Sequence, residues 1–289
     1  MKRVSIVFML LFLLFGCQQR AVKSNKSLVT VSILPLKFFV ERIGADFFDV
    51  NVLVPPGSGP ETYEPSPQEM IRVSNSVLFF KTGYYEIENL LSVKLKDMNK
   101  DLTVVDLSKG ADIIKEVQEE GHASHCGGVD PHIWSGISTS KVMINNILQE
   151  LSNKFPEHKA EFETNYSKLI TEIDSLDVYI KNKLKGAKRS TFVMYHPSLG
   201  YYARDYHLNQ IALEAEGKSP SASHIRSLID LIRKEEIKTI FLQAQFDVHN
   251  TEAIANEIKG KVVTIDPLDA DWLGNMYRMT DKITTSLNE

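Results

Sequence analysis

The chain has 289 residues, of which 43% are hydrophobic and 24% are charged, and its net charge is −4. This composition is that of a globular protein, and the length suggests two domains. The slight acidic excess argues against a nucleic-acid partner, and two cysteines are too few for a disulfide framework or a cysteine-rich zinc module.

The first 16 residues have the pattern of an export signal. Two basic residues precede an apolar run over residues 4–15, which is shorter than the roughly 20 residues of a membrane-spanning helix. The run ends in Phe15-Gly16-Cys17, which resembles a bacterial lipobox. We therefore predict a signal peptide over residues 1–16, lipidation of Cys17 and a polar tether over residues 17–27; a signal with an incidental cysteine is the alternative. Lipidation would anchor the protein to a membrane outside the cytoplasm, on the periplasmic face or the cell surface.

Strand-like and helix-like segments alternate over residues 28–155. This alternation predicts βαβ units around a parallel sheet, and we assign the segment to an N-terminal α/β lobe. The predicted strands cover residues 29–34, 50–54, 77–80 and 103–105, and the predicted helices cover residues 36–43, 67–73 and 86–95.

A long helix is predicted between the two halves of the chain, over residues 156–186. No proline or glycine occurs from Glu157 to Lys185, and the helix would be about 40 Å long at about 1.5 Å per residue. A coiled-coil partner could use its apolar stripe. A helix packed across two lobes accounts for the stripe without a partner, and we expect a monomer. The stripe consists of Phe162, Tyr166, Leu169, Ile173, Leu176, Ile180 and Leu184.

Residues 187–289 repeat the alternation and are assigned to a C-terminal α/β lobe. Strands are predicted over residues 191–195, 239–242 and 262–265, and apolar stripes with helical spacing occur over residues 225–232 and 272–283. The predicted fold class is therefore α/β, with two lobes of parallel sheets flanked by helices and joined by a long helix.

Polar side chains that could bind a ligand follow two of the predicted strands. His196 comes directly after residues 191–195, and Asp266 comes directly after residues 262–265. Polar residues at the carboxyl ends of parallel strands face the crevice in which α/β sheets bind ligands. Each could also be an ordinary turn residue, but a histidine and a carboxylate in such positions together favour a binding site.

Two segments before the long helix carry further candidate residues. In Asp130-Pro131-His132-Ile133-Trp134 the proline restricts the backbone before the histidine, and Asp130 can accept a hydrogen bond that holds the turn. The loop over residues 55–67 is stiffened by prolines and glycines, and Glu61 and Glu64 are its only acidic residues. Taken alone, each of these side chains is more simply explained as an ordinary loop residue.

Together these motifs resemble the cluster of bacterial solute-binding proteins that capture zinc or manganese for ABC importers. The resemblance covers nearly the whole chain after the signal, and it implies two α/β lobes joined by a long helix, a metal ion in the cleft between them, and an ABC permease as partner. The motifs, which lie in the order of the family, are residues 55–67, 83–88, 130–134, 194–206 and 264–268.

The resemblance also implies the metal ligands. The family usually has a histidine at the position of Glu61, whose carboxylate can still bind a divalent cation through oxygen. A glycine-flanked segment resembles a shortened form of the histidine-rich loop of zinc-capturing members, and its His122, His125 and Cys126 could form an auxiliary metal site or belong to a loop without a role. The four implied ligands are Glu61, His132, His196 and Asp266.

The implied ligands favour zinc as the cargo. Zinc binds a generic site of nitrogen and oxygen ligands more tightly than manganese does, and we therefore expect Zn²⁺, with Mn²⁺ or iron as the alternative within the same class of protein. Because both imidazoles must be neutral to bind metal, affinity should fall as the pH drops toward about 6.5.

A binding protein is favoured over an enzyme. Four protein ligands would leave no open position for a reacting water, as a zinc hydrolase requires, and no HExxH motif occurs. A cleft for an organic ligand such as cobalamin or a siderophore would instead display aromatic and cationic groups.

Overall fold

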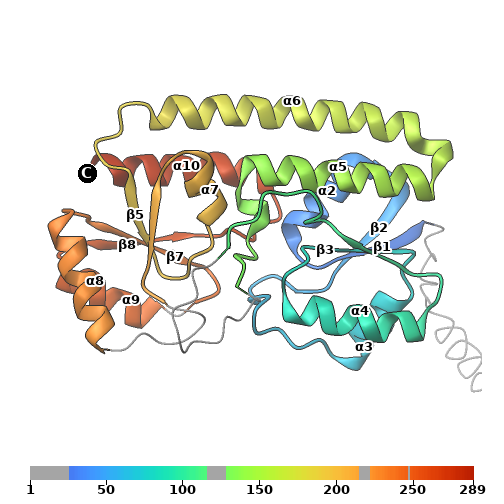
Figure 1. The fold of residues 1–289 in the computed structure, drawn as a ribbon, viewed down its shortest axis with the longest axis horizontal. Coiled ribbons are helices and arrows are strands. Elements are labelled where there is room, and N and C mark those ends of the chain that lie inside the picture. The colour runs from blue at the N-terminus through green and yellow to red at the C-terminus, as the bar shows by residue number, and fades with distance from the viewer. Residues whose placement is uncertain (1–25, 116–127, 215–221, 247) are drawn as a thin grey trace, which may run out of the picture.

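The computed structural model describes residues 26–115, 128–214, 222–246 and 248–289. Within these ranges the chain forms two four-stranded parallel sheets flanked by helices (Figure 1), which confirms the predicted α/β fold class. In the described part of the chain, no helix combines the length and the apolar character that spanning a membrane requires. Several predicted features lie outside the described residues: the signal peptide, Cys17, His122, His125 and Cys126.

The first sheet belongs to the N-terminal half and has the strand order β2-β1-β3-β4. Helices cover both faces of the sheet, and its two central strands are mostly apolar and mostly buried. The register places Val29 of β1 opposite Val50 of β2 and Leu78 of β3. The elements are β1 (Ser27–Val31), α2 (Leu34–Gly44), η2 (Ala45–Phe47), β2 (Phe48–Val52), α3 (Pro67–Ser74), β3 (Leu78–Lys81), α4 (Glu86–Met98) and β4 (Thr103–Asp106).

The second sheet belongs to the C-terminal half and has the strand order β6-β5-β7-β8. The sequence does not predict β6, because this strand lies at the edge of the sheet, is at least partly exposed along its length and has no apolar run. The elements are β5 (Thr191–Met194), α7 (Gly200–Asp205), β6 (Asn209–Ala212), α8 (Ala222–Lys234), β7 (Thr239–Gln243), α9 (Val248–Glu257), β8 (Lys261–Ile265) and α10 (Trp272–Asn288).

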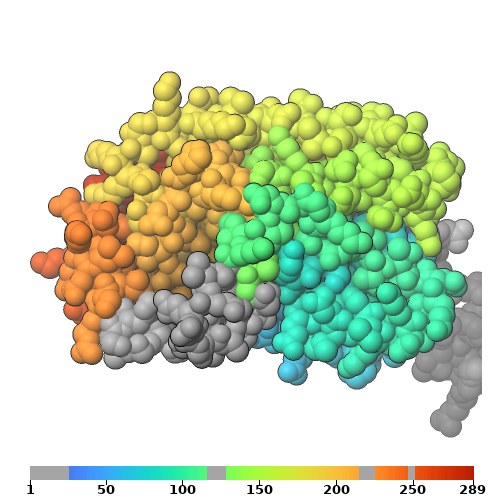
Figure 2. Space-filling view, viewed as in Figure 1, coloured from blue at the N-terminus to red at the C-terminus, as the bar shows by residue number. Residues whose placement is uncertain are grey.

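A long helix, α6 (Lys159–Leu184), spans both halves, as the apolar stripe predicts. It follows a single 3₁₀ turn, η4 (Pro156–His158), and packs on α2 and α5 (Ile137–Lys154) of the first half and on α10 of the second. In the space-filling view it forms a continuous ridge along the upper edge of the molecule (Figure 2). The residue limits of the two lobes stay a prediction. The buried face of α6 consists of Phe162, Leu169, Ile173, Leu176 and Ile180, all 0% exposed.

Two tryptophans join the halves. Trp134, in the 3₁₀ turn η3 (Ile133–Ser135), donates its indole N–H to the carbonyl of Pro267, and Trp272 donates its own to the carbonyl of Trp134, both at 2.9 Å. The ring of Trp272 also packs edge-on against Phe39, with centroids 4.9 Å apart. All three aromatic residues belong to one apolar core that continues from the first sheet to the second. Opening the two halves like a hinge would therefore expose apolar surface to water.

The buried face of α6 generates a stability prediction. Ile173→Ala removes a fully buried side chain from the buried face of α6, and we expect the free energy of unfolding to decrease by about 2–5 kcal/mol. Val178→Ala on the same helix, at a side chain that is 57% exposed, should change it by no more than about 0.5 kcal/mol. Chemical denaturation of the metal-free proteins measures both values, and equal effects would contradict this assignment of the buried face.

Candidate metal centre

Three of the four predicted ligands lie together. Their ligand atoms, on Glu61, His132 and His196, are all within 4.8 Å of one another. His132 Nε2 is 3.1 Å from His196 Nε2, and Glu61 Oε1 is 3.2 Å and 3.5 Å from these two nitrogens. In a tetrahedral zinc site with bonds of about 2.0–2.1 Å, two ligand atoms lie about 3.3 Å apart. The three atoms therefore have the spacing of one face of a zinc tetrahedron.

The three candidate ligands come from both halves of the chain. Glu61 lies on the loop between β2 and α3, and His132 lies directly before η3. His196 follows β5 of the second sheet by two residues, which agrees with its predicted place at the carboxyl end of a parallel strand. The histidine side chains are 6% and 12% exposed and that of Glu61 is 24% exposed, so solvent reaches the group mainly past the carboxylate.

Asp130 orients the first imidazole. Its Oδ1 accepts a hydrogen bond from the backbone N–H of His132 at 2.9 Å, which holds the turn as the sequence predicts. The same oxygen lies 2.8 Å from His132 Nδ1. This second contact fixes the ring so that Nε2 is the nitrogen left for a metal ion.

Glu214 orients the second imidazole in the same way. Its Oε2 lies 3.0 Å from His196 Nδ1, and the residue is only 7% exposed. The sequence prediction misses Glu214 because it misses β6, which ends two residues earlier. With β6 recognised, a carboxylate just beyond the carboxyl end of a parallel strand is the signal that would identify it.

Further contacts fix the backbone and ring of His196. The side-chain amide of Gln243 accepts a hydrogen bond from the N–H of His196 at 3.3 Å and donates to its carbonyl. The ring of Phe246 stacks on the imidazole, with centroids 5.3 Å apart and planes 26° apart. On the other side of the group, Tyr85 donates its hydroxyl to Glu61 Oε1 at 3.4 Å. Neighbouring side chains therefore hold both His196 and the Glu61 carboxylate.

Asp266, the fourth predicted ligand, is not part of this group among the residues that the structure describes. It follows β8 as predicted, but its Oδ1 accepts hydrogen bonds from Gln245 Nε2 at 2.8 Å and from the N–H of Leu268 at 3.0 Å. Gln245 in turn lines the cavities that adjoin the three ligands. The role of Asp266 as a ligand stays a prediction.

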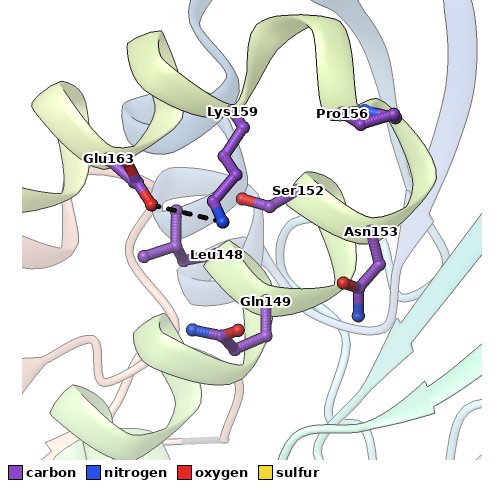
Figure 3. A pocket seen from close by; sticks show the side chains of 7 residues that line it. All are labelled: Leu148, Gln149, Ser152, Asn153, Pro156, Lys159 and Glu163. Carbon is purple, nitrogen blue, oxygen red and sulfur yellow. Dashed lines mark ion pairs between the residues drawn. The ribbon is translucent and has the colours of Figure 1, made fainter.

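Two cavities adjoin the three ligands, and both are lined by Glu61, His132 and His196. The smaller has a volume of about 20 Å³, enough for about one water molecule. The larger has a volume of about 750 Å³. A separate cavity of about 330 Å³ lies at the turn between α5 and α6, away from the ligands (Figure 3). Its two charged side chains, Lys159 and Glu163, pair with each other at 3.8 Å, and we assign it no function.

The carboxylates change the proton affinity of the group. Burial raises the pKa of Glu61, but hydrogen bonds from His132 and His196 outweigh this effect and leave the pKa well below its usual range. Burial lowers the pKa of His132, but the bonds to Asp130 and Glu61 outweigh burial and raise it to about 9. The pKa of His196 is also raised, because Glu214 and Glu61 outweigh burial and the repulsion of His132. In the metal-free protein, the two imidazoles therefore tend to carry the protons that a bound dication would replace.

These pKa values give a prediction for the pH dependence of metal binding. A metal ion binds the neutral imidazole, so affinity is highest above the pKa of the metal-free histidine and falls as the pH decreases below it. Because the pKa of His132 is raised to about 9, the fall should begin well above the usual histidine range near 6.5, at about tenfold per pH unit for one proton.

Zinc titration calorimetry between pH 6 and 8.5, in buffers with different heats of ionisation, measures this dependence and counts the protons released. We expect release of one proton or more per zinc ion at pH 7.5. An affinity that does not change with pH over this range, with no proton release, would contradict the raised pKa.

The contact between Glu214 and His196 gives a second prediction. Glu214→Ala removes the acceptor that orients the imidazole and should weaken zinc binding by about 10–100-fold. Glu214→Gln keeps a side-chain oxygen in place and should lose less zinc affinity than Glu214→Ala does. Glu252→Ala, at an exposed position on α9, is the matched control and should bind as the wild type does. Competition with a chromophoric zinc indicator measures all three, and wild-type affinity in Glu214→Ala would exclude an orienting role.

Comparisons with known proteins agree with this geometry. A family model described as "Zinc-uptake complex component A periplasmic" (ZnuA) matches residues 29–286. Among solved structures, a crystal structure of a ZnuA deletion mutant with zinc bound superposes with a TM-score of 0.84 and 32% sequence identity, over 92% of this chain and 99% of that one.

Curated relatives show more distant similarity. The high-affinity zinc uptake system protein ZnuA of Bacillus subtilis is 25% identical over 258 residues, which cover 86% of this chain and 80% of that protein. The zinc-binding lipoprotein AdcA of Streptococcus pneumoniae is 25% identical over 284 residues, which cover 93% of this chain and 56% of that protein. This chain therefore spans little more than half the length of AdcA. The family match extends over nearly all of the chain that follows the predicted signal and tether, and the chain belongs to the ZnuA family of zinc-uptake solute-binding proteins.

Proposed function

We propose that this protein captures zinc outside the cytoplasm, in the cleft between its two halves, and delivers it to the permease of an ABC importer. The observation that carries this proposal is the convergence of Glu61, His132 and His196 from both halves with the spacing of a zinc tetrahedron. Membership of the ZnuA family supports it. That family consists of solute-binding proteins for zinc uptake, not enzymes, which leaves the zinc-hydrolase alternative without support.

The donor atoms favour zinc over manganese. Two of the three are imidazole nitrogens, which suit zinc, and a generic site of this kind binds zinc more tightly than manganese. We propose Glu61, His132 and His196 as ligands. Asp266 is retained as the predicted fourth ligand, and it would reach the ion only after giving up its hydrogen bonds to Gln245 and Leu268. Mn²⁺ remains the alternative cargo.

Release should begin at Glu61. The two histidines are buried and each is held by a carboxylate, whereas Glu61 lies on a loop and is the most exposed of the three ligands. Because the halves share an apolar core, moving this loop disturbs less packing than separating the halves does. A permease that displaces Glu61 would remove one ligand and so weaken binding. We further propose that the protein is a monomer held at the membrane by a lipid on Cys17.

The proposed function is tested by metal content and by one pair of variants on the same loop. Protein purified without chelators should contain about one zinc ion per chain by mass spectrometry. Glu61→Ala should weaken zinc binding by at least about 100-fold, more than loss of an orienting partner does. Glu64→Ala, which removes an exposed carboxylate three residues away, should bind as the wild type does. Manganese as the main metal, or wild-type affinity in Glu61→Ala, would contradict the proposal.

A further inference from the structure

We propose that the cleft accepts zinc together with a small organic ligand of the size and chemistry of a free amino acid. A donor of this ligand would complete the coordination of zinc, and its carbon skeleton would lie in the larger of the two cavities beside Glu61, His132 and His196. This inference rests on the proposed function and specifies the form in which the cargo is bound.

The first argument is size. One water molecule takes about 30 Å³ of liquid volume, so a zinc ion with one bound water fills a small part of a 750 Å³ cavity. Cavities of about 300–1,000 Å³ are those in which proteins bind small organic molecules. The cavity is not separated from the metal ligands, because Glu61, His132 and His196 all form part of its wall.

The second argument is the number of ligands. Zinc in proteins usually has four ligands, and the described residues bring together three side chains that can bind it. The carboxylate of Asp266 is held by Gln245 Nε2 and by the N–H of Leu268. While it keeps these bonds, the fourth position on zinc is available to a donor from outside the protein.

The third argument is the chemistry of the wall. Ile114, Pro197, Ala203 and Leu208 contribute apolar surface, from which a hydrated ion gains nothing and a carbon skeleton gains burial.

Two amides add polar groups to this wall. Gln210 Oε1 accepts a hydrogen bond from the N–H of Leu199 at 2.8 Å, and its NH₂ group bonds to none of the residues that the structure describes. Gln245 Nε2 donates to Asp266, which leaves its Oε1 as an acceptor. One donor and one acceptor suit the carboxylate and the amino group of an amino acid.

The test uses zinc and radiolabelled L-histidine with the purified full chain. In equilibrium dialysis, histidine should be retained by the zinc-loaded protein, one per chain, and not by the metal-free protein. With free zinc held constant by a metal buffer, histidine should raise the apparent zinc affinity by about fivefold or more, within the usual range of coupling between two sites. By linkage, zinc must raise the affinity for histidine by the same factor, which provides an internal check.

Filling the cavity should abolish the histidine effect. Ala203→Leu places a larger side chain in the wall without altering a zinc ligand, and Ala160→Leu makes the same substitution at an exposed position of α6 as the matched control. Thr62→Trp, at an exposed position on the rim of the cavity, serves as a second variant if Ala203→Leu does not fold.

Three outcomes would overturn the inference. Histidine only withdraws zinc from the protein, binds equally without zinc, or keeps its full effect in both cavity variants. Failure of the proposed function is distinguishable from these, because it is seen in the same assay before histidine is added, as a protein that does not bind zinc or does not depend on Glu61.

Discussion

The structure depends on keeping two imidazole nitrogens 3.1 Å apart in a largely buried site. An unpaired buried charge is costly, and two adjacent imidazoles repel each other once they are protonated. The protein meets this constraint by alternating carboxylates with imidazoles, so that each ring lies between two acidic groups. Protons balance the negative charge in the metal-free state, and a dication can replace them. The sequence of contacts is Asp130, His132, Glu61, His196 and Glu214, with separations of 2.8, 3.2, 3.5 and 3.0 Å.

This series of contacts runs from one half of the molecule to the other. The distances between the candidate ligands therefore depend on how precisely the two halves are held relative to each other. Metal–ligand distances tolerate deviations of about 0.2 Å. A loose linker could not hold Glu61 and His196 to that precision, whereas a shared core can. The indole hydrogen bonds of Trp134 and Trp272 run between the halves, and α6 packs against helices of both. The same rigidity makes a ligand on a loop a better point of release than a hinge.

Much of the fold and the convergence of three residues at the candidate site could be predicted from the sequence, for identifiable reasons. The spacing of apolar residues predicts α6, because a long helix that packs on a core must repeat its buried face. The position of His196 just after a buried strand identifies it as a candidate ligand. Strand β6 and Glu214 could not be predicted, since a half-exposed edge strand has no apolar run to mark it. The position of the Asp266 carboxylate depends on Gln245, a contact between side chains 21 residues apart that no local pattern encodes.

The carboxylate at position 61, where the resemblance to the family predicts a histidine, changes the balance between metal and protons. A neutral imidazole would supply one nitrogen, whereas Glu61 Oε1 lies within 3.5 Å of both histidines and raises the pKa of each. Protons therefore compete more strongly with the metal ion as the pH falls. Glu61 also places a full negative charge beside a dication in a site where water is largely excluded, and there an opposite charge stabilises more than it does in solution. Both effects follow from a carboxylate at position 61, so stabilisation of a bound dication and competition from protons are linked at this candidate site.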